Sequence, residues 1–448
     1  MFGHKTFQEV YVVKCGKFHY QVVREVRCLR CGKTISFQMT EPKRRSTLLQ
    51  EGGFLDNIMT YKLREYQQQA VDKAVAFLTD SRAKYNGIIV IPTGGGKSHI
   101  VAAIANRLDG NVLIFSPSRE ILAQNFEKMS AINPFGCTIF SASFNSKEVG
   151  KVTFATIGSA KSYPELFKQF RYIIVDECHQ CNPKQGMYKE FFEALGQTKI
   201  LGLTATPYRL SSYMGGSMLK FITRTRPHIF SKVIYQVQIS TLLDMGFLSN
   251  IEYYQLSPIG WNEGNLKINT TGADYTDKSV IREYERIDFY TYLVSIVQRL
   301  MKPKRGGARK GILVFTRFVK EAQRLADSIP DCAVVSGDTP KAERDRMLTD
   351  FKSGKIQVVA NANVLSTGFD YPQLDTVVMA RPTMSLAMYY QIVGREIRPY
   401  KGKQAWFVDL CGNINRFGRV EDLRLVDTNG KGKWAVFNRT KQLTNVLF

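Results

Sequence analysis

The sequence predicts an α/β protein with two successive doubly wound parallel sheets, preceded by a small β-rich module. Residues 87–91 form an apolar, β-branched run that leads into a glycine-dense turn and a helix-compatible run. A carboxylate pair, Asp176 and Glu177, directly follows the apolar run at residues 172–175, which suits a buried parallel strand. A second series of alternating strand and helix patterns begins at Gly311. Such alternation is typical of parallel sheets that bind ligands at the carboxyl ends of their strands.

The turn after residue 91 has the composition of a phosphate-binding loop. Glycines let backbone N–H groups curl around phosphate oxygens without a Cβ clash, and a helix N-terminus adds partial positive charge. We predict that Lys97 reaches the β- and γ-phosphates and that the Ser98 hydroxyl binds Mg²⁺. Ile91 stands where such loops usually have their first glycine. The predicted nucleotide contacts in this loop are Thr93, Gly94, Gly95, Gly96, Lys97 and Ser98.

The carboxylate pair narrows the chemistry. Alone, the glycine-rich loop leaves kinases, GTPases, ATPases and a purely structural turn open. At a strand end, Asp176 can bind the metal ion of the loop, and Glu177 can orient and deprotonate a water molecule beside the γ-phosphate. A solvated acidic turn does not explain why both signals follow buried strands in this order. The sequence therefore predicts an ATPase.

The composition indicates a polyanion as partner. The 448 residues carry a formal net charge of +23, and 44% of them are hydrophobic, which suits a globular chain of two or three domains. A solvated surface excess is the alternative explanation of the charge, but polyanion binding explains it better. We find no apolar run of about 20 residues and no signal-peptide pattern. We therefore expect a cytoplasmic protein without a membrane partner, with reduced thiols among its eight cysteines.

Residues 1–45 are predicted to form a separate module, with short strand-like runs at residues 10–13 and 20–23. A C-x-x-C pair followed by glycine is typical of half a zinc site. A tetrahedral zinc ion would stabilise so small a module. A small β-hairpin with unpaired thiols is the alternative. The predicted zinc ligands are Cys15, His19, Cys28 and Cys31.

Further polar residues lie near the predicted strand ends of the first α/β half. Gln67 falls in the helical pattern of residues 63–78, where its amide can match the adenine edge. Thr204 and Thr206 follow a predicted strand, and their hydroxyls can link the nucleotide site to neighbouring elements. A plain turn before Pro207 is the alternative. Strands are predicted at residues 111–115, 152–156 and 199–203, and helices at residues 234–248 and 288–300.

The second α/β half has no phosphate-binding loop, but it carries two arginines three residues apart. Arg395 and Arg398 share one helical face and follow Gln391. Arginines on a partner domain can reach the γ-phosphate and stabilise transition-state charge, as an arginine finger does. Surface salt bridging is the alternative for either arginine alone. Strands are predicted at residues 312–315, 333–335, 356–360, 376–379 and 405–408.

Together these residues resemble the superfamily 2 helicases and translocases over about residues 60–425. The DECH box at residues 176–179, with the segments 204–209 and 393–399, is similar to the DNA repair branch, which includes RadD-type helicases and phage UvsW-type branch-migration enzymes. The resemblance implies two RecA-like domains, with ATP and Mg²⁺ in the cleft between them. The predicted limits are 1–45 for the N-terminal module, 55–235 for the first RecA-like domain, 236–310 for a connecting segment and 311–448 for the second RecA-like domain.

The resemblance also implies roles for single residues. His179 would couple hydrolysis to the domain interface together with Thr204 and Thr206, while Gly368 and Asp370 would contact the nucleotide. The implied catalytic residues are Lys97, Asp176, Glu177, Gln391, Arg395 and Arg398. The implied nucleic-acid contacts are Ser116, Arg119, Thr156, Gly158, Arg317 and Thr367.

As a function, the resemblance implies an ATP-dependent helicase or translocase that acts on forked, branched or Holliday-junction DNA in a bacterial or phage-infected cell. We expect a monomer with little sequence preference, because backbone contacts carry no sequence information. Two alternatives stay open. One is an RNA helicase, because a grip on the backbone serves both polymers. The other is a nucleic-acid-binding scaffold whose ATPase is only a switch.

Overall fold

The computed structural model describes residues 6–14, 19–28, 34–39, 43–44, 62–133, 136–196, 199–213, 216–270, 272, 274–302, 307–362, 364–365, 369 and 371–446. Side chains are described from residue 62 onward, except those of residues 212–217. The chain divides into two compact units. One comprises residues 1–80, 98–174 and 194–198, and the other comprises residues 81–97, 175–193 and 199–448.

The N-terminal strands form an antiparallel sheet. They are β1 (Thr6–Lys14), β2 (His19–Cys28), β3 (Thr34–Met39) and β4 (Lys43–Arg44). β2 pairs with each of the other three strands. Of the predicted zinc ligands, Cys15 and Cys31 lie outside the described residues, and the side chains of His19 and Cys28 are not described. The zinc site therefore stays a prediction.

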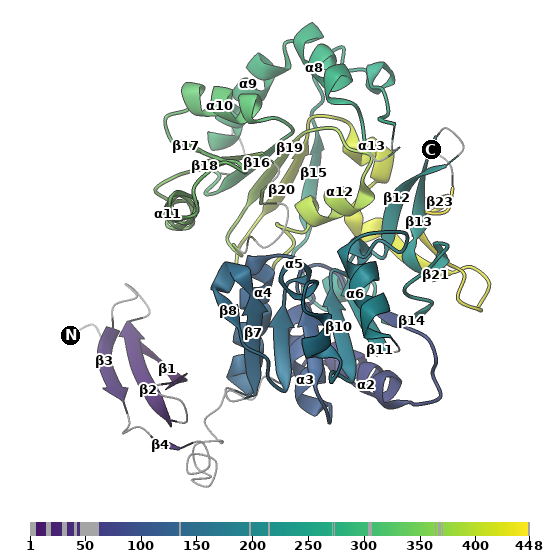
Figure 1. Ribbon diagram of the computed structural model, residues 1–448. Helices are drawn as coiled ribbons and strands as arrows, with labels where there is room; N and C mark the ends of the chain where they lie inside the picture. The colour runs from purple at the N-terminus through teal and green to yellow at the C-terminus, as the bar shows by residue number, and fades with distance from the viewer. Residues whose placement is uncertain are drawn as a thin grey trace. The chain divides into compact units, whose positions relative to one another are not determined.

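An eight-stranded sheet has the order β14-β5-β11-β10-β6-β9-β7-β8 (Figure 1). The strands β5, β6, β9 and β10 are buried along their whole length, as their largely apolar sequences predict. β5 pairs in parallel with β11 and β14, and β9 pairs in parallel with β6 and β7. The bounds are β5 (Gly87–Val90), β6 (Val112–Phe115), β7 (Cys137–Ser141), β8 (Ser146–Lys147), β9 (Val152–Ala155), β10 (Tyr172–Asp176), β11 (Lys199–Thr204) and β14 (Lys232–Gln236).

Amphipathic helices alternate with these strands. In α2, the buried Ala70, Val71, Ala74 and Leu78 recur at helical spacing, so one face of the helix packs on the core. Ser118 caps the N-terminus of α4, since its side chain accepts a hydrogen bond from the N–H of Ile121 at 3.3 Å. The bounds are α2 (Glu65–Thr79), α3 (Lys97–Arg107), α4 (Arg119–Ile132), α5 (Ile157–Ala160) and α6 (Met187–Leu195).

A six-stranded sheet in the second unit has the order β15-β20-β19-β16-β18-β17, with every neighbouring pair parallel. The helices α8, α9 and α10 pack on one face of it and share a hydrophobic core with its strands (Figure 1). The strands are β15 (Ile251–Gln255), β16 (Ile312–Thr316), β17 (Cys332–Val335), β18 (Val358–Ala362), β19 (Thr376–Ala380) and β20 (Ala405–Asp409). The helices are α8 (Asp277–Arg286), α9 (Phe289–Met301), α10 (Val319–Ser328), α11 (Lys341–Lys352), α12 (Leu386–Val393) and α13 (Asn413–Phe417).

The expected helix at residues 234–248 is wrong in its first part. The chain there completes β14 as an edge strand beside β5, and only α7 (Ile239–Asp244) is helical. Sheet pairing outweighs helical periodicity at this edge, because propensity is a weak preference that tertiary context overrides. The predicted helix at residues 288–300 is confirmed as α9. β15, from the segment predicted as a connection, forms the edge of the six-stranded sheet.

Two small sheets lie in the second unit. They are the hairpin of β12 (Tyr208–Tyr213) with β13 (Gly216–Phe221), and the sheet of β21 (Leu423–Asp427), β22 (Trp434–Asn438) and β23 (Lys441–Gln442). The Gln238 side chain exchanges hydrogen bonds with the backbone of Leu425, at 2.9 and 3.1 Å. These bonds attach the C-terminal sheet beside α7. No helix in the described part of the chain is long and apolar enough to span a bilayer.

Candidate nucleotide site and nucleic-acid contacts

The loop between β5 and α3 has a backbone that glycine alone accommodates readily. Gly94 and Gly96 have φ of 80° and 78°, in the left-handed region. A Cβ on Gly95 would lie 2.7 Å from Ile91 Cγ2 and 3.0 Å from the Pro92 carbonyl oxygen. That carbonyl oxygen accepts the Gly95 N–H at 3.0 Å, which closes the turn. The loop thus presents backbone at the N-terminus of a helix, which is a favourable place for a phosphate.

Lys97, the first residue of α3, meets the carboxylate pair of β10. Its Nζ lies 3.1 Å from Glu177 Oε1, and the two side chains are only 13% and 12% exposed. Glu177 has φ of 50°, a conformation that L-residues rarely adopt, and its N–H donates to Asp176 Oδ1 at 2.9 Å. Burial raises the pKa of Glu177, but the combined effect of Lys97 and His179 lowers it by more. The pKa of Glu177 therefore lies well below its usual range. Glu177 is therefore an ionised carboxylate at neutral pH.

Two of the three residues predicted to couple hydrolysis to the domain interface, His179 and Thr204, contact the other oxygen of Glu177, and the third, Thr206, contacts His179. His179 Nδ1 lies 2.9 Å from Thr204 Oγ1, 3.1 Å from Thr206 Oγ1 and 3.3 Å from Glu177 Oε2. Thr204 Oγ1 donates to Glu177 Oε2 at 3.4 Å and accepts the Thr206 N–H at 3.0 Å. Both threonines are fully buried. Arg209, which sequence reasoning missed, donates from Nη1 to the His179 carbonyl oxygen at 2.9 Å.

The end of α12 approaches the phosphate-binding loop. A Cβ on Gly394 would lie 2.8 Å from Thr93 Cγ2, so only glycine permits this packing. The hydroxyl of Tyr390 shares a hydrogen bond with the Thr93 backbone, and burial raises the pKa of this tyrosine. A Cβ on Gly94 would lie 3.9 Å from Arg398 Cγ. The aliphatic part of the Arg398 side chain therefore lies beside the loop. The contacts of Tyr390 and Gly394 with Thr93 were not predicted from the sequence.

The prediction that the two finger arginines share one helical face is wrong, because α12 ends at Val393, before both of them. Arg395 is buried, and Arg398 is partly buried. Arg395 is 8% exposed, and its Nη1 donates to the Phe369 carbonyl oxygen at 2.7 Å. Burial lowers the pKa of Arg395 to about 10, while the charge of Glu177 acts in the opposite direction. Burial also lowers the pKa of Arg398 to about 10. Both guanidinium groups keep their charge at neutral pH, and Arg395 lies within the electrostatic reach of Glu177.

The other predicted nucleotide contacts are placed less decisively. Gln67 is buried, and its Oε1 accepts the Arg64 N–H at 3.0 Å, which closes the first turn of α2. Ser98 and Gln391 are half-buried on α3 and α12. The Ser98 hydroxyl and the Asp176 carboxylate are hard oxygen donors, which is the ligand chemistry that Mg²⁺ prefers. Thr367, Gly368 and Asp370 lie outside the described residues.

Four predicted nucleic-acid contacts lie in the first unit. Ser116 is fully buried, and its hydroxyl accepts from Asn125 Nδ2 at 3.1 Å. Thr156 donates from Oγ1 to the Ser159 hydroxyl, within α5, at 3.0 Å. A Cβ on Gly158 would meet no atom within 4 Å, so backbone there is open to a ligand. Arg119 donates to the Ser143 carbonyl oxygen and stacks over an aromatic ring.

The placement of Arg317 argues against the predicted nucleic-acid contact. Its side chain is 8% exposed, with Nη2 2.8 Å from Asp277 Oδ1 and Nη1 3.3 Å from Asp274 Oδ2. Nη2 also donates to the Tyr275 carbonyl oxygen at 2.6 Å. Arg317 joins the start of α8 to the end of β16, and we do not carry it forward as a phosphate contact. This placement could not be predicted, because the partners of Arg317 lie about forty residues earlier in the chain.

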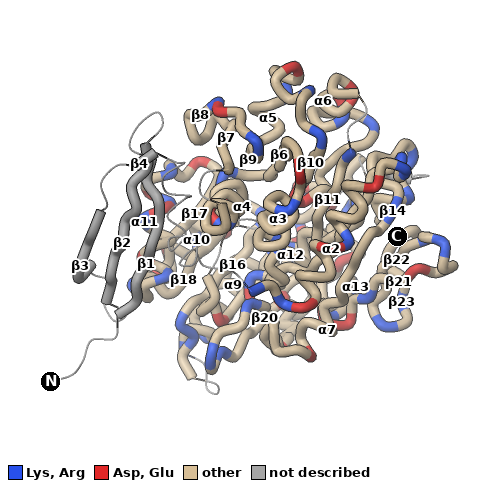
Figure 2. The backbone as a smooth tube through the Cα atoms, turned by 90° about the horizontal axis from the view of Figure 1, so that it is seen from below, with Lys and Arg blue, Asp and Glu red and all other residues tan. Residues whose placement is uncertain are grey.

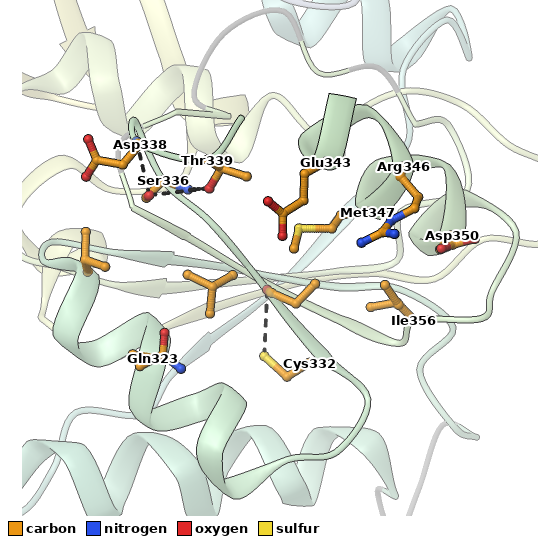
Figure 3. Close-up of a pocket in the computed structure, with 13 residues that line it drawn as sticks. Gln323, Cys332, Ser336, Asp338, Thr339, Glu343, Arg346, Met347, Asp350 and Ile356 are labelled. Carbon is orange, nitrogen blue, oxygen red and sulfur yellow. Dashed lines mark hydrogen bonds between the residues drawn. The ribbon is translucent and has the colours of Figure 1, made fainter. Parts of the chain in front are cut away.

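A pocket of about 690 Å³ lies in the second unit, apart from these residues (Figure 3). Side chains from α10, β17 and α11 line it, among them Gln323, Cys332, Glu343 and Arg346. Figure 3 shows Ser336 and Thr339 bonded to each other at its rim, where their hydroxyls lie 3.4 Å apart. None of the predicted site residues lines this pocket. The site is therefore defined by its side chains rather than by this hollow.

Comparisons with known proteins agree with this arrangement. Residues 60–209 match the family described as "Type III restriction enzyme, res subunit", and residues 293–399 match "Helicase conserved C-terminal domain". A "51.5 kDa protein" of a Lactococcus phage is 27% identical, over 74% of this chain and 67% of that protein. The "DNA 3'-5' translocase XPB2" of Sulfurisphaera tokodaii is 26% identical, over 78% of this chain and 81% of that protein.

A solved structure, "ATP-dependent Type ISP restriction-modification enzyme LlaBIII bound to DNA", matches with a TM-score of 0.58 and 19% identity, over 78% of this chain and 27% of that one. This likeness concerns the fold. Two tandem RecA-like domains with a phosphate-binding loop, a carboxylate pair and a paired arginine segment define an ATP-hydrolysing helicase. The two matched segments are the paired domains of the superfamily 2 helicases, to which this chain is similar.

Proposed function

We propose that this chain is an ATP-driven DNA translocase that acts on forked or branched DNA. The observation that carries the proposal is the cluster of Lys97, Glu177 and His179, with Arg395 within electrostatic reach of Glu177. The polymer is argued from relatives named as DNA translocases and from the net charge of +23. The resemblance to branch-migration enzymes supports branched DNA as the preferred form.

We propose that the ion pair between Lys97 and Glu177 is exchanged when ATP binds. The ammonium group of Lys97 then pairs with the phosphates, and Glu177 loses its nearest cation. Loss of a neighbouring cation raises the pKa of a carboxylate, so Glu177 becomes a better base for the attacking water. His179 and Thr204 still hold the second carboxylate oxygen, so the side chain keeps its orientation. Basicity would then rise only when the phosphates are present.

The arginines supply positive charge where negative charge develops on the transferred phosphoryl group. We assign the finger role to Arg398, whose stem lies beside Gly94. Arg395 is held by the Phe369 carbonyl oxygen, and its charge interacts with that of Glu177. Ser98 and Asp176 would hold Mg²⁺, which neutralises phosphate charge when bound. A change in the charge environment of Glu177 would alter the contacts of His179 with Thr204 and Thr206, at the end of β11.

A substrate panel tests the proposal against its two alternatives. Purified protein is given forked DNA, Holliday junctions, linear DNA duplexes and RNA duplexes at equal concentration, with ATP turnover and strand displacement both recorded. A DNA branch-migration enzyme turns over ATP and displaces strands with junctions and forks. Displacement of RNA duplexes alone would favour the RNA helicase. Turnover without displacement on every substrate would favour the scaffold with an ATPase switch.

DNA binding should weaken steeply with salt and depend little on base sequence. Lysines and arginines lie on many of the described elements, so several phosphates can be neutralised together (Figure 2). Each neutralised phosphate contributes about −0.7 to −0.9 to the slope of log K against log salt. Fluorescence anisotropy at a series of salt concentrations, with two unrelated sequences, measures both effects. A flat response would mean that the charge excess is only a solvated surface.

The N-terminal module is proposed to bind one zinc ion and to contact the DNA junction. Elemental analysis of protein purified without chelators should find about one zinc per chain. The double variant Cys28→Ser, Cys31→Ser should lose it, whereas Cys332→Ser, on β17, should keep it. Absence of metal from the unmodified protein would reject the zinc site. Deletion of residues 1–45 should reduce junction unwinding more than basal ATPase activity, and unchanged unwinding would reject the DNA contact.

A further inference from the structure

After α12 ends at Val393, the chain continues as an irregular segment that carries both arginines. Carbonyl groups in such a segment need donors from elsewhere, because no helix or sheet ladder satisfies them. The Ile397 carbonyl oxygen accepts the Ser249 N–H at 2.7 Å. The Arg398 carbonyl oxygen accepts the Ser249 hydroxyl at 3.2 Å. The loop before β15 thus holds one side of the segment.

Lys403 holds the other side. Its Nζ donates to the carbonyl oxygens of Glu396 and Arg398, both at 2.5 Å, and to that of Pro372 at 3.2 Å. An ammonium group has three N–H donors, so all three are used on backbone acceptors. Pro372 lies three residues after Phe369, whose carbonyl oxygen accepts from Arg395. Lys403 therefore joins the segment that carries the arginines to the segment that receives Arg395.

We propose that Lys403 is a positioning residue for ATP hydrolysis, whose ammonium group fixes the backbone on which Arg395 and Arg398 stand. The inference rests on the proposed role of the two arginines. A rigid support matters because electrostatic stabilisation of a transition state depends on groups that are already in place. A displacement of about 1 Å in such a group can reduce the rate about 100-fold.

The charge of Lys403 gives this support a pH limit. Burial lowers the pKa of Lys403 to about 8, with a smaller contribution from Arg398, while Glu396 and Asp375 act in the opposite direction. As the pH rises through about 8, the ammonium group loses a proton and one of its three donors. One backbone acceptor then loses its partner. The turnover number should fall on the alkaline side, because the arginines lose their fixed support.

The test compares Lys403→Met with Lys401→Met, which removes an exposed lysine two residues earlier. In Lys403→Met, the turnover number of DNA-stimulated ATP hydrolysis should fall about 10- to 100-fold. ATP affinity and the melting temperature should stay close to those of the unmodified protein. Lys401→Met should match the unmodified protein in all three measurements. Lys403→Arg keeps a charged donor, so its activity should extend to higher pH than that of the unmodified protein.

Either of two results with Lys403→Met would overturn the inference. One is a turnover number in Lys403→Met within about twofold of the unmodified protein; the other is a parallel loss of ATP affinity and melting temperature, which indicates a structural role. If Lys403→Met does not fold, the unmodified protein still decides: turnover that is constant from about pH 7 to about pH 10 overturns the inference. Normal hydrolysis by both Arg395→Ala and Arg398→Ala refutes the arginine roles. Inactive Arg398→Ala with active Lys403→Met refutes the Lys403 role alone.

Discussion

Glu177→Gln is expected to abolish ATP turnover while DNA binding stays largely intact. The substitution keeps the shape of the side chain but removes the charge that meets Lys97 at 3.1 Å and the oxygen that takes a proton from water. Loss of an aligned water or of a γ-phosphate clamp costs about 10²–10⁴ in rate, or roughly 3–5 kcal/mol. Lys97→Ala should have an effect of the same size, through the clamp. Steady-state ATP hydrolysis at saturating DNA measures both.

DNA affinity serves as the internal control, because the net charge of +23 is spread over the whole chain and a single substitution changes it little. Glu193→Gln, on the exposed face of α6, is the matched control for the loss of a carboxylate. It should hydrolyse ATP as the unmodified protein does. Near-normal turnover in Glu177→Gln or in Lys97→Ala would remove the basis of the proposed mechanism.

The parts of the fold that sequence reasoning predicted are those with a local cause. β5, β10 and β16 consist almost wholly of apolar residues, and their burial follows from that composition. The turn of the phosphate-binding loop was predictable, because the positive φ that it needs at residues 94 and 96 is readily adopted by glycine. A turn that needs glycine leaves a mark in the sequence at the place where the turn occurs.

The parts that it did not predict depend on contacts between distant segments. β14 and β15 become strands because each finds a parallel neighbour, β5 and β20, that is far away in the chain. Arg317 fits the motif pattern, but acidic residues before and within α8 occupy its guanidinium group. Lys403 has no motif around it, and its three backbone acceptors appear only in the folded chain.

The candidate site shows the same division. The carboxylate pair at the end of a strand was predicted, because it lies within one short segment. The helical face expected for the arginine pair was wrong, because α12 ends at Val393 and the arginines follow in irregular backbone. The left-handed backbone of Glu177 was not predicted, since its amino acid type does not favour positive φ. The approach of Gly394 to Thr93 was also not predicted, because a glycine near a helix end is usually explained by local capping. Contacts between two motifs, such as that of Gly394 with Thr93, cannot be predicted from either motif alone.

Arg398→Ala is expected to retain ATP affinity and to lose hydrolysis. Arginine fingers contribute about 10³–10⁵ in rate, because they meet charge that exists only in the transition state. The side chain of Arg398 lies beside Gly94. Burial lowers its pKa to about 10, so the guanidinium group is still charged at neutral pH. Equilibrium binding of ATP and single-turnover hydrolysis separate the two effects. Arg282→Ala, an exposed position on α8, is the matched control and should be unchanged in both.

The comparison with Arg395→Ala decides which arginine is the finger. Arg395 already donates to the Phe369 carbonyl oxygen and lies within the field of Glu177, so its loss removes a backbone contact as well as a charge. We therefore expect Arg395→Ala to lower both the melting temperature and the turnover number, and Arg398→Ala to lower the turnover number alone. Normal hydrolysis in Arg398→Ala, with hydrolysis lost in Arg395→Ala, would transfer the finger role to Arg395.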